Sequence, residues 1–229
     1  MNGKLKQDLA ALWQRILRTD ATKLFGKHHK SIRDYNEDDW IAQPGYVGSQ
    51  YRTRGLVFVA VNPGGQKRED IGFADSKQYK LLKKLRDAAP KFRVAAFENL
   101  NRDLVRSMKN WNIYRRYIPE ILKGTDIGFS DVAYVNLVKW RTVGEGMPRA
   151  VVKISWEAHT REQLALLRPS LIVSLGKSIA GPFIDEFYNE EVHNITIPRT
   201  RRDLRLSDGS KAAIKLARTC LFRWIKRRE

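Results

Sequence analysis

"GLVFVAVNPGG", residues 55–65, is the stretch that sets the fold class of this chain. The run from Leu56 to Val61 is apolar at every position, which is typical of a strand covered on both faces. It stops at Asn62-Pro63-Gly64-Gly65, where proline and glycine favour a turn. Strands of this kind belong to a parallel sheet between helical layers, so the stretch predicts an α/β protein.

Three further apolar runs predict the rest of the sheet, at residues 132–140, 171–177 and 192–199. Stretches with helical spacing alternate with these runs, at residues 76–89, 97–111, 114–122, 155–167, 177–189 and 210–228. Such an alternation is typical of right-handed β-α-β crossovers. We therefore predict a three-layer α/β/α sandwich around a central, mostly parallel four-stranded sheet.

The predicted domain organisation is simple. Residues 1–229 are expected to form a single domain, because the chain is long enough for one sizeable core and contains no internal repeat or low-complexity linker. Residues 1–54 precede the first predicted strand and combine an amphipathic helix with a polar stretch dotted with aromatic residues. We expect these residues to form an N-terminal helical and loop extension.

The charge of the chain indicates a polyanionic partner. It carries 43 Lys and Arg against 25 Asp and Glu, a formal net charge of +18 and a pI near 10.1. A membrane surface would attract such a charge, but the sequence contains no apolar run of about 18 residues and no dominant basic amphipathic helix. Nucleic acid, and DNA in particular, is therefore the favoured partner.

The cysteine and histidine content predicts neither a disulfide nor a metal site. Cys220 is the one cysteine, and His28 and His29 lack the i, i+4 spacing of helical zinc ligands. The N-terminus also lacks the apolar segment and small-residue cleavage site of a secretory signal. We expect a cytoplasmic monomer without metal or cofactor.

Candidate site residues follow the four predicted strands. Ligands of open parallel sheets bind beyond the carboxyl ends of the strands, so residues at these four places should meet in one cleft. The cleft would take its backbone turn from Pro63, Gly64 and Gly65. Phosphate contacts are expected from Lys139, Gly176, Lys177, Ser178, Arg201 and Arg202.

Each of these sets also has a structural interpretation that the sequence leaves open. Asn62 and its neighbours could form an ordinary turn, and Asn136 could hydrogen-bond to a nearby loop instead of a ligand. The stretch Gly176-Lys177-Ser178 could be a plain turn between a strand and a helix. It is not a complete phosphate-binding loop, because Leu171 stands where that motif requires glycine.

With these elements placed, the chain resembles the uracil-DNA glycosylase superfamily over about residues 55–200. The stretch from Ala60 to Gly64 is similar to the first motif of its mismatch-specific and single-strand-selective branches. The stretches "NPGGQKREDIGF", "VAYVNLVKWRTVGEGMPR" and "LRPSLIVSLGKSIA" resemble the thermostable iron–sulfur branch. Trp140 stands where that branch has a cluster cysteine, so we expect no iron–sulfur cluster.

The resemblance implies a monofunctional DNA glycosylase, which hydrolyses the N-glycosidic bond of a flipped-out base and leaves an abasic site. Asn62 would orient the attacking water, and Asn136 would pair with the edge of the base through one donor and one acceptor. Phe73 would stack on the base. The family's closing His-Pro-Ser is Ile197-Pro198-Arg199 here, so Arg199 would donate to the departing base in place of histidine.

The sequence leaves the substrate and two rival functions open. The excised base could be uracil or a modified or damaged pyrimidine, and a bulky phage-type cytosine would indicate antiviral defence rather than housekeeping repair. The main alternative is a non-catalytic nucleic-acid-binding protein on the same fold. A third interpretation is a nucleotide-phosphate enzyme that uses residues 176–178.

Overall fold

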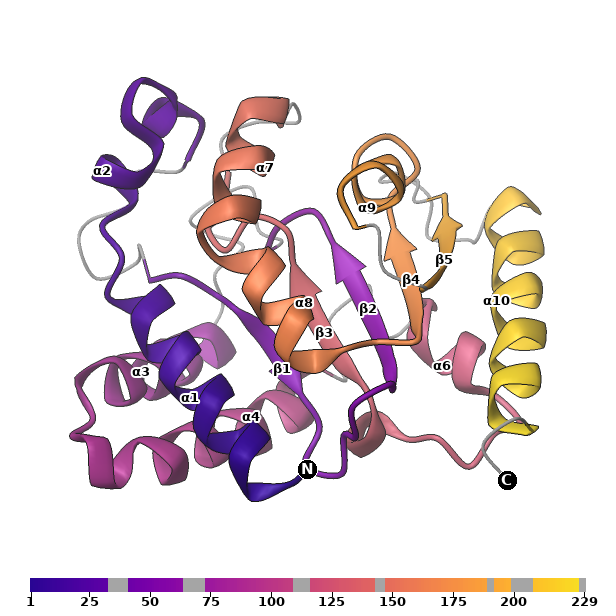
Figure 1. Cartoon of the computed structure of the whole chain (residues 1–229), viewed down its shortest axis with the longest axis horizontal. Helices are drawn as coiled ribbons and strands as arrows, with labels where there is room; N and C mark the ends of the chain where they lie inside the picture. Colours follow the sequence, from indigo (N-terminus) through magenta and orange to yellow (C-terminus); the bar gives the residue numbers. More distant parts are fainter. Residues whose placement is uncertain are drawn as a thin grey trace.

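A five-stranded sheet forms the middle layer of the protein, and helices flank it (Figure 1). The computed structural model describes residues 1–32, 41–63, 73–108, 116–142, 147–188, 192–198 and 208–226. The strand order is β1-β3-β2-β4-β5. This architecture confirms the predicted α/β/α sandwich, but the prediction of four strands was wrong by one.

The four apolar runs of the sequence form the parallel part of the sheet. They correspond to β2 (Leu56–Ala60), β3 (Ala133–Asn136), β4 (Leu171–Leu175) and β5 (His193–Ile197). β2 and β4 are buried at every position, as their lack of alternation predicted. β2 lies between β3 and β4, with Ala60 opposite both Asn136 and Leu175.

Helices connect and cover these strands. They are α1 (Gly3–Leu17), α2 (Ala21–Phe25), α3 (Phe73–Asp87), α4 (Arg93–Met108), α6 (Ile118–Leu122), α7 (Arg149–Ser155), α8 (Arg161–Leu167), α9 (Ala180–Phe187) and α10 (Asp208–Lys226). A π-helical turn, Trp156–Thr160, joins α7 to α8. Within the described ranges, none of the helices has both the length and the apolar composition needed to cross a membrane.

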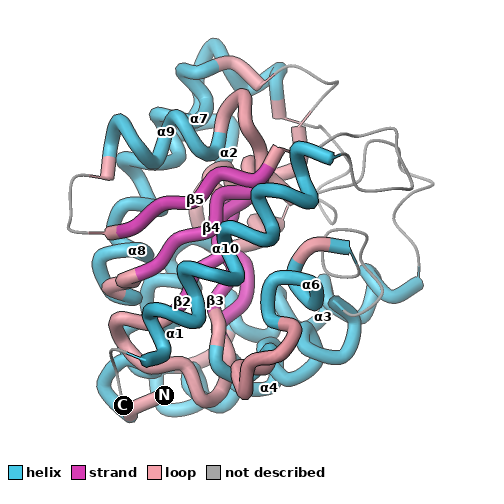
Figure 2. The backbone as a smooth tube through the Cα atoms, turned by 90° about the vertical axis from the view of Figure 1, so that its right-hand side faces the viewer, coloured by secondary structure: helices cyan, strands magenta, loops and turns pink. Residues whose placement is uncertain are grey.

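α9 and α10 both pack against β5 (Figure 2). Two consecutive residues of this strand contact the two helices. Asn194 donates a hydrogen bond to Asp185 of α9, at 2.7 Å. His193, on the other face, lies 3.4 Å from the Cys220 sulfur of α10. The period of two along a strand therefore directs one helix to each face of the sheet.

Residues 1–54 contain the expected helix and also contribute a strand to the sheet. α1 buries Leu9, Trp13 and Ile16 completely, and the Trp13 ring packs edge-on against Phe97 of α4 at 4.9 Å. β1 (Gly45–Val47) adds an antiparallel strand to β3. A strand of three residues is too short to produce a readable periodicity, which is why the sequence did not predict it.

The carboxyl ends of the parallel strands meet at one edge of the sheet. Beyond the last paired residues, the Leu137 nitrogen donates to the Ala60 carbonyl and the Val138 nitrogen to the Val61 carbonyl, both at 2.8 Å. The chain segments that follow β2 and β3 consequently stay side by side past the ends of the strands. This edge is where the candidate residues were expected.

Candidate functional site

Asn62 lies two residues past the end of β2, and its side chain is half-buried. Its amide nitrogen donates a hydrogen bond to the Thr142 hydroxyl oxygen at 2.9 Å. Thr142 is itself buried, and its backbone pairs with Ile32 in an isolated β-bridge. The side-chain oxygen of Asn62, Oδ1, makes no hydrogen bond to any of the described residues, so it remains available as an acceptor.

Asn136 is the last residue of β3, and only 3% of its surface is exposed. Its amide nitrogen donates to the Gln43 carbonyl oxygen at 3.0 Å. Its side-chain oxygen, Oδ1, is buried without a hydrogen-bond partner in the described part of the chain. A buried acceptor left unpaired costs about 1–3 kcal/mol, so this oxygen needs a donor that none of the described residues supplies.

This geometry revises the expected role of Asn136. The sequence allowed either a structural hydrogen bond or base recognition. In the structure the side-chain nitrogen makes a structural hydrogen bond, and only the side-chain oxygen could recognise a base. The nitrogen holds the segment that precedes β1, whereas the oxygen has the free acceptor capacity. A base edge would therefore meet one acceptor here, instead of the expected donor and acceptor.

Lys139 does not face the cleft, which contradicts its predicted phosphate contact. The side chain is fully buried, and its ammonium donates to the backbone carbonyl oxygen of Asn136 at 2.6 Å and to Gln163 Oε1 at 2.7 Å. Burial lowers the pKa of Lys139 well below its usual value. Gln163 in turn donates to the Pro44 carbonyl oxygen at 3.1 Å. Lys139 thus links β3 to α8 by hydrogen bonds inside the protein, and Gln163 extends this link to the segment before β1.

The stretch from Gly176 to Ser178 follows β4 at the same edge. Gly176 has φ +142°, a conformation that favours glycine, and its nitrogen donates to the Ile197 carbonyl oxygen at 3.0 Å. Lys177 and Ser178 are exposed, and Lys177 makes no ion pair with a described residue. α9 begins at Ala180, later than expected, so these residues form a loop ahead of the helix.

Several predicted site residues cannot be placed. Pro63 is buried directly after Asn62. Gly64, Gly65, Arg199, Arg201 and Arg202 lie outside the described residues. Phe73 begins α3, and its side chain also lies outside the described part of the structure, so its stacking role stays a prediction.

Sequence reasoning missed the residues that orient the two asparagines. Thr142 and Gln43 hold Asn62 and Asn136 through their amide nitrogens. Gln43 also donates to the Tyr79 hydroxyl of α3, at 3.3 Å, and Arg141 donates to the same oxygen at 3.2 Å. Thr142 could have been found from the sequence, because it lies shortly after Asn136 in a stretch that resembles a family motif. No local sequence feature predicted the role of Gln43.

Comparisons with known proteins add no family assignment. No family model matches this chain, and a search of curated proteins finds no significant match. Across the described ranges, no three His, Cys, Asp or Glu side chains are grouped closely enough to hold a metal ion. A function can therefore be inferred only from the residues of the site.

Proposed function

We propose that this protein is a DNA glycosylase that hydrolyses the N-glycosidic bond of a flipped-out pyrimidine and leaves an abasic site. One observation carries the proposal. Asn62 follows β2, and Asn136 ends the neighbouring strand β3. Each side chain is held through its amide nitrogen, Nδ2, and each side-chain oxygen, Oδ1, has no hydrogen-bond partner among the described residues. The site thus offers two oriented acceptors: one for a water and one for a base.

Asn62 would position the attacking water. A neutral amide is too weak a base to remove a proton from water, so its contribution is to hold the water against the sugar as positive charge develops there. The hydrogen bond to Thr142 supports this role, because it fixes the direction of the Asn62 oxygen before the substrate arrives. No metal is needed for this step.

Asn136 would select a base that presents an N–H group. The ring N–H of uracil and the exocyclic amino group of a cytosine derivative both meet this requirement, so uracil and modified cytosines remain the candidate substrates. Burial of the Asn136 oxygen strengthens the preference, since a base without a donor there would leave the acceptor unpaired.

The net charge of +18 supports DNA as the partner. Lys177 is an exposed cation at the carboxyl edge of the sheet and is a candidate phosphate contact. Arg199 would stabilise the negative charge of the departing base. The proposal describes a monomer that acts in the cytoplasm, in repair or in defence against phage DNA.

Release of free base tests the proposal directly. Wild type and Asn62→Ala are incubated with uracil-containing, deaminated and phage-modified DNAs, and released bases are identified by mass spectrometry. Wild type should release one base, whereas Asn62→Ala should release none and bind the same DNA with nearly unchanged affinity. Asn62→Asp is the matched control: it keeps an acceptor oxygen to which Thr142 can donate, so it should retain measurable release.

Two results would contradict the proposal. If Asn62→Ala weakened DNA binding as much as base release, Asn62 would be a binding or folding residue. If wild type bound DNA but released no base from any member of the panel, the non-catalytic nucleic-acid-binding function would replace the enzymatic one.

A further inference from the structure

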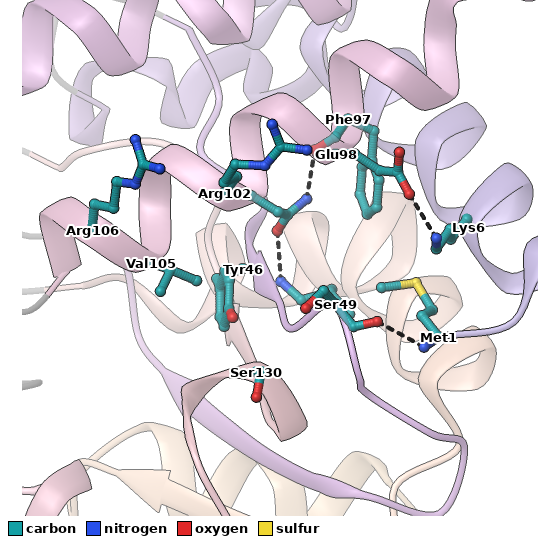
Figure 3. A pocket seen from close by; sticks show the side chains of 12 residues that line it. Met1, Lys6, Tyr46, Ser49, Phe97, Glu98, Arg102, Val105, Arg106 and Ser130 are labelled. Carbon is teal, nitrogen blue, oxygen red and sulfur yellow. Dashed lines mark hydrogen bonds and ion pairs between the residues drawn. The ribbon is translucent and has the colours of Figure 1, made fainter.

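A cavity of about 310 Å³ lies beside β1. Figure 3 shows the side chains that line it. Its walls come from α1, β1, α4 and the segment before β3. Val47 lines it and pairs with Ala133, the first residue of β3. The cavity is therefore at the amino edge of the parallel strands, whereas the two asparagines are at the carboxyl edge.

Each polar side chain of the buried floor of this cavity is already hydrogen-bonded within the protein. Its members are Tyr46, Val47, Phe97 and Asn101. The Tyr46 hydroxyl donates to the Phe129 carbonyl oxygen at 2.6 Å, and burial raises its pKa, so it stays protonated. The Asn101 side chain accepts from the Val47 nitrogen at 2.8 Å and donates to the Phe97 carbonyl oxygen at 2.9 Å.

A floor of this kind favours a ligand whose buried part is apolar. A nucleobase would lose several hydrogen bonds to water on entry and find few replacements among groups that are already hydrogen-bonded, which costs free energy for each group left unpaired. An aromatic ring or a short alkyl chain loses no hydrogen bond and gains burial against Tyr46, Phe97 and Val105. The cavity is thus unlike the proposed base site in its chemistry.

The rim of the cavity is positively charged. Arg102 and Arg106 lie one turn apart on α4, and both are exposed and make no ion pair with a described residue. The nearby Glu98 is already paired with Lys6 at 2.6 Å, so it does not neutralise them. Like charges at i, i+4 repel, and guanidinium groups bind carboxylate and phosphate groups well, so an anion between them would be stabilising.

The geometry points to a binding site for a small amphiphilic anion: an aryl or short alkyl group with one carboxylate, sulfonate or phosphate. The hydrocarbon would occupy the floor, and the anionic group would lie between Arg102 and Arg106. The volume suits such a ligand, because small-molecule pockets start at about 300 Å³. This site is independent of the proposed glycosylase function and uses none of its residues.

Fluorescence titration with anilinonaphthalene sulfonate, an aromatic anion, tests the site. Wild type should bind it at a single saturable site. Naphthoate and octanoate serve as aryl and alkyl competitors, and at least one should displace the probe, whereas thymidine monophosphate should not. Replacing both arginines, Arg102→Gln with Arg106→Gln, should weaken binding by about tenfold or more.

Two control variants separate this site from non-specific binding to a basic protein. Lys215→Gln with Arg223→Gln removes the same charge from exposed positions of α10 and should leave affinity unchanged within about twofold. Val105→Trp should fill the cavity and abolish binding, with folding checked by circular dichroism. Equal weakening by both double variants, or displacement by the nucleotide as effective as by naphthoate, would overturn the inference.

Discussion

Thr142 holds Asn62 by the nitrogen of its side-chain amide. An unrestrained asparagine side chain can present either its oxygen or its nitrogen, and only the oxygen can accept a hydrogen bond from water. The 2.9 Å hydrogen bond from the Asn62 nitrogen to the Thr142 hydroxyl leaves Oδ1 as the atom that can accept from a water. The geometry of the candidate site therefore depends on the residue that holds each asparagine as well as on the asparagine itself.

Thr142→Val removes this hydroxyl with little change in size. We expect the rate of base release to fall by about 10- to 100-fold, because Asn62 would lose its fixed orientation, with little change in DNA affinity. Single-turnover rates and fluorescence anisotropy measure the two effects. Thr142→Ser keeps the hydroxyl and should remain close to wild type; release by Thr142→Val as fast as by wild type would show that this hydrogen bond does not orient Asn62.

His159 makes the stability of the protein depend on pH. The side chain is buried, and neither ring nitrogen makes a well-formed hydrogen bond to a described residue. Burial, followed by the charges of Lys139 and Arg15, lowers the pKa of His159 from 6.5 to about 4. A weak contact with the Ala158 backbone opposes this shift only slightly.

Since the unfolded state binds a proton at a higher pH than the folded state, the folded protein should lose stability as the pH falls from 6.5 towards 4. The loss should reach about 3 kcal/mol over this range. Urea unfolding at a series of pH values measures it. His159→Phe should flatten the dependence in this window; an unchanged dependence in the variant would assign the effect to other groups.

Lys139 shows where residue-level prediction failed. Lysine is rarely buried, and its position after a strand in a strongly basic chain favoured contact with phosphate. Its neighbours in space, Asn136 and Gln163, provide two acceptors inside the protein instead. Gln163 is 24 residues away in the chain, so no local pattern could reveal this contact.

At the scale of elements, the contact between α9 and β5 depends on one glycine. Gly181 in α9 lies against Thr196 of β5, and a Cβ atom at position 181 would overlap the Thr196 side chain. The strand and helix can approach each other closely because this Cβ is missing. The loop that carries Lys177 joins these layers, so their spacing also positions that residue.

Gly181→Ala should lower the free energy of unfolding by about 1–3 kcal/mol, because the overlap forces the helix away from the strand. Gly209→Ala in α10 is the matched control, since an added Cβ there has no neighbour within 4 Å. This control should be neutral or stabilising by up to about 1 kcal/mol. Urea unfolding compares the two; equal effects would mean that contact with Thr196 does not limit the packing.

The elements also show how far the sequence predicted the fold. A continuous apolar run marked β2, and stretches rich in apolar and β-branched residues marked β3, β4 and β5. β1 has three residues, and it is a strand only because β3 offers it a free edge. Pairing with a distant partner, not local propensity, creates this element.

At the scale of the whole molecule, the net charge of +18 predicts DNA binding that weakens steeply as salt increases. Fluorescence anisotropy from about 50 to about 200 mM salt measures the slope of log affinity against log salt. Lys177→Gln should reduce the magnitude of this slope by about one, as expected for a lost phosphate contact. Lys139→Gln should leave the slope unchanged because Lys139 is fully buried; a reduced slope would restore its predicted role.

The sequence by itself determined the α/β class, the four parallel strands, the positions of Asn62 and Asn136 at strand ends, and the excess of positive charge. These properties follow from local periodicity, turn residues and composition. Only the tertiary structure decided the fifth strand, the burial of Lys139, the orientation of the two asparagines and the cavity beside α4. Each of these depends on contacts between residues far apart in the chain, and a local pattern carries no information about them.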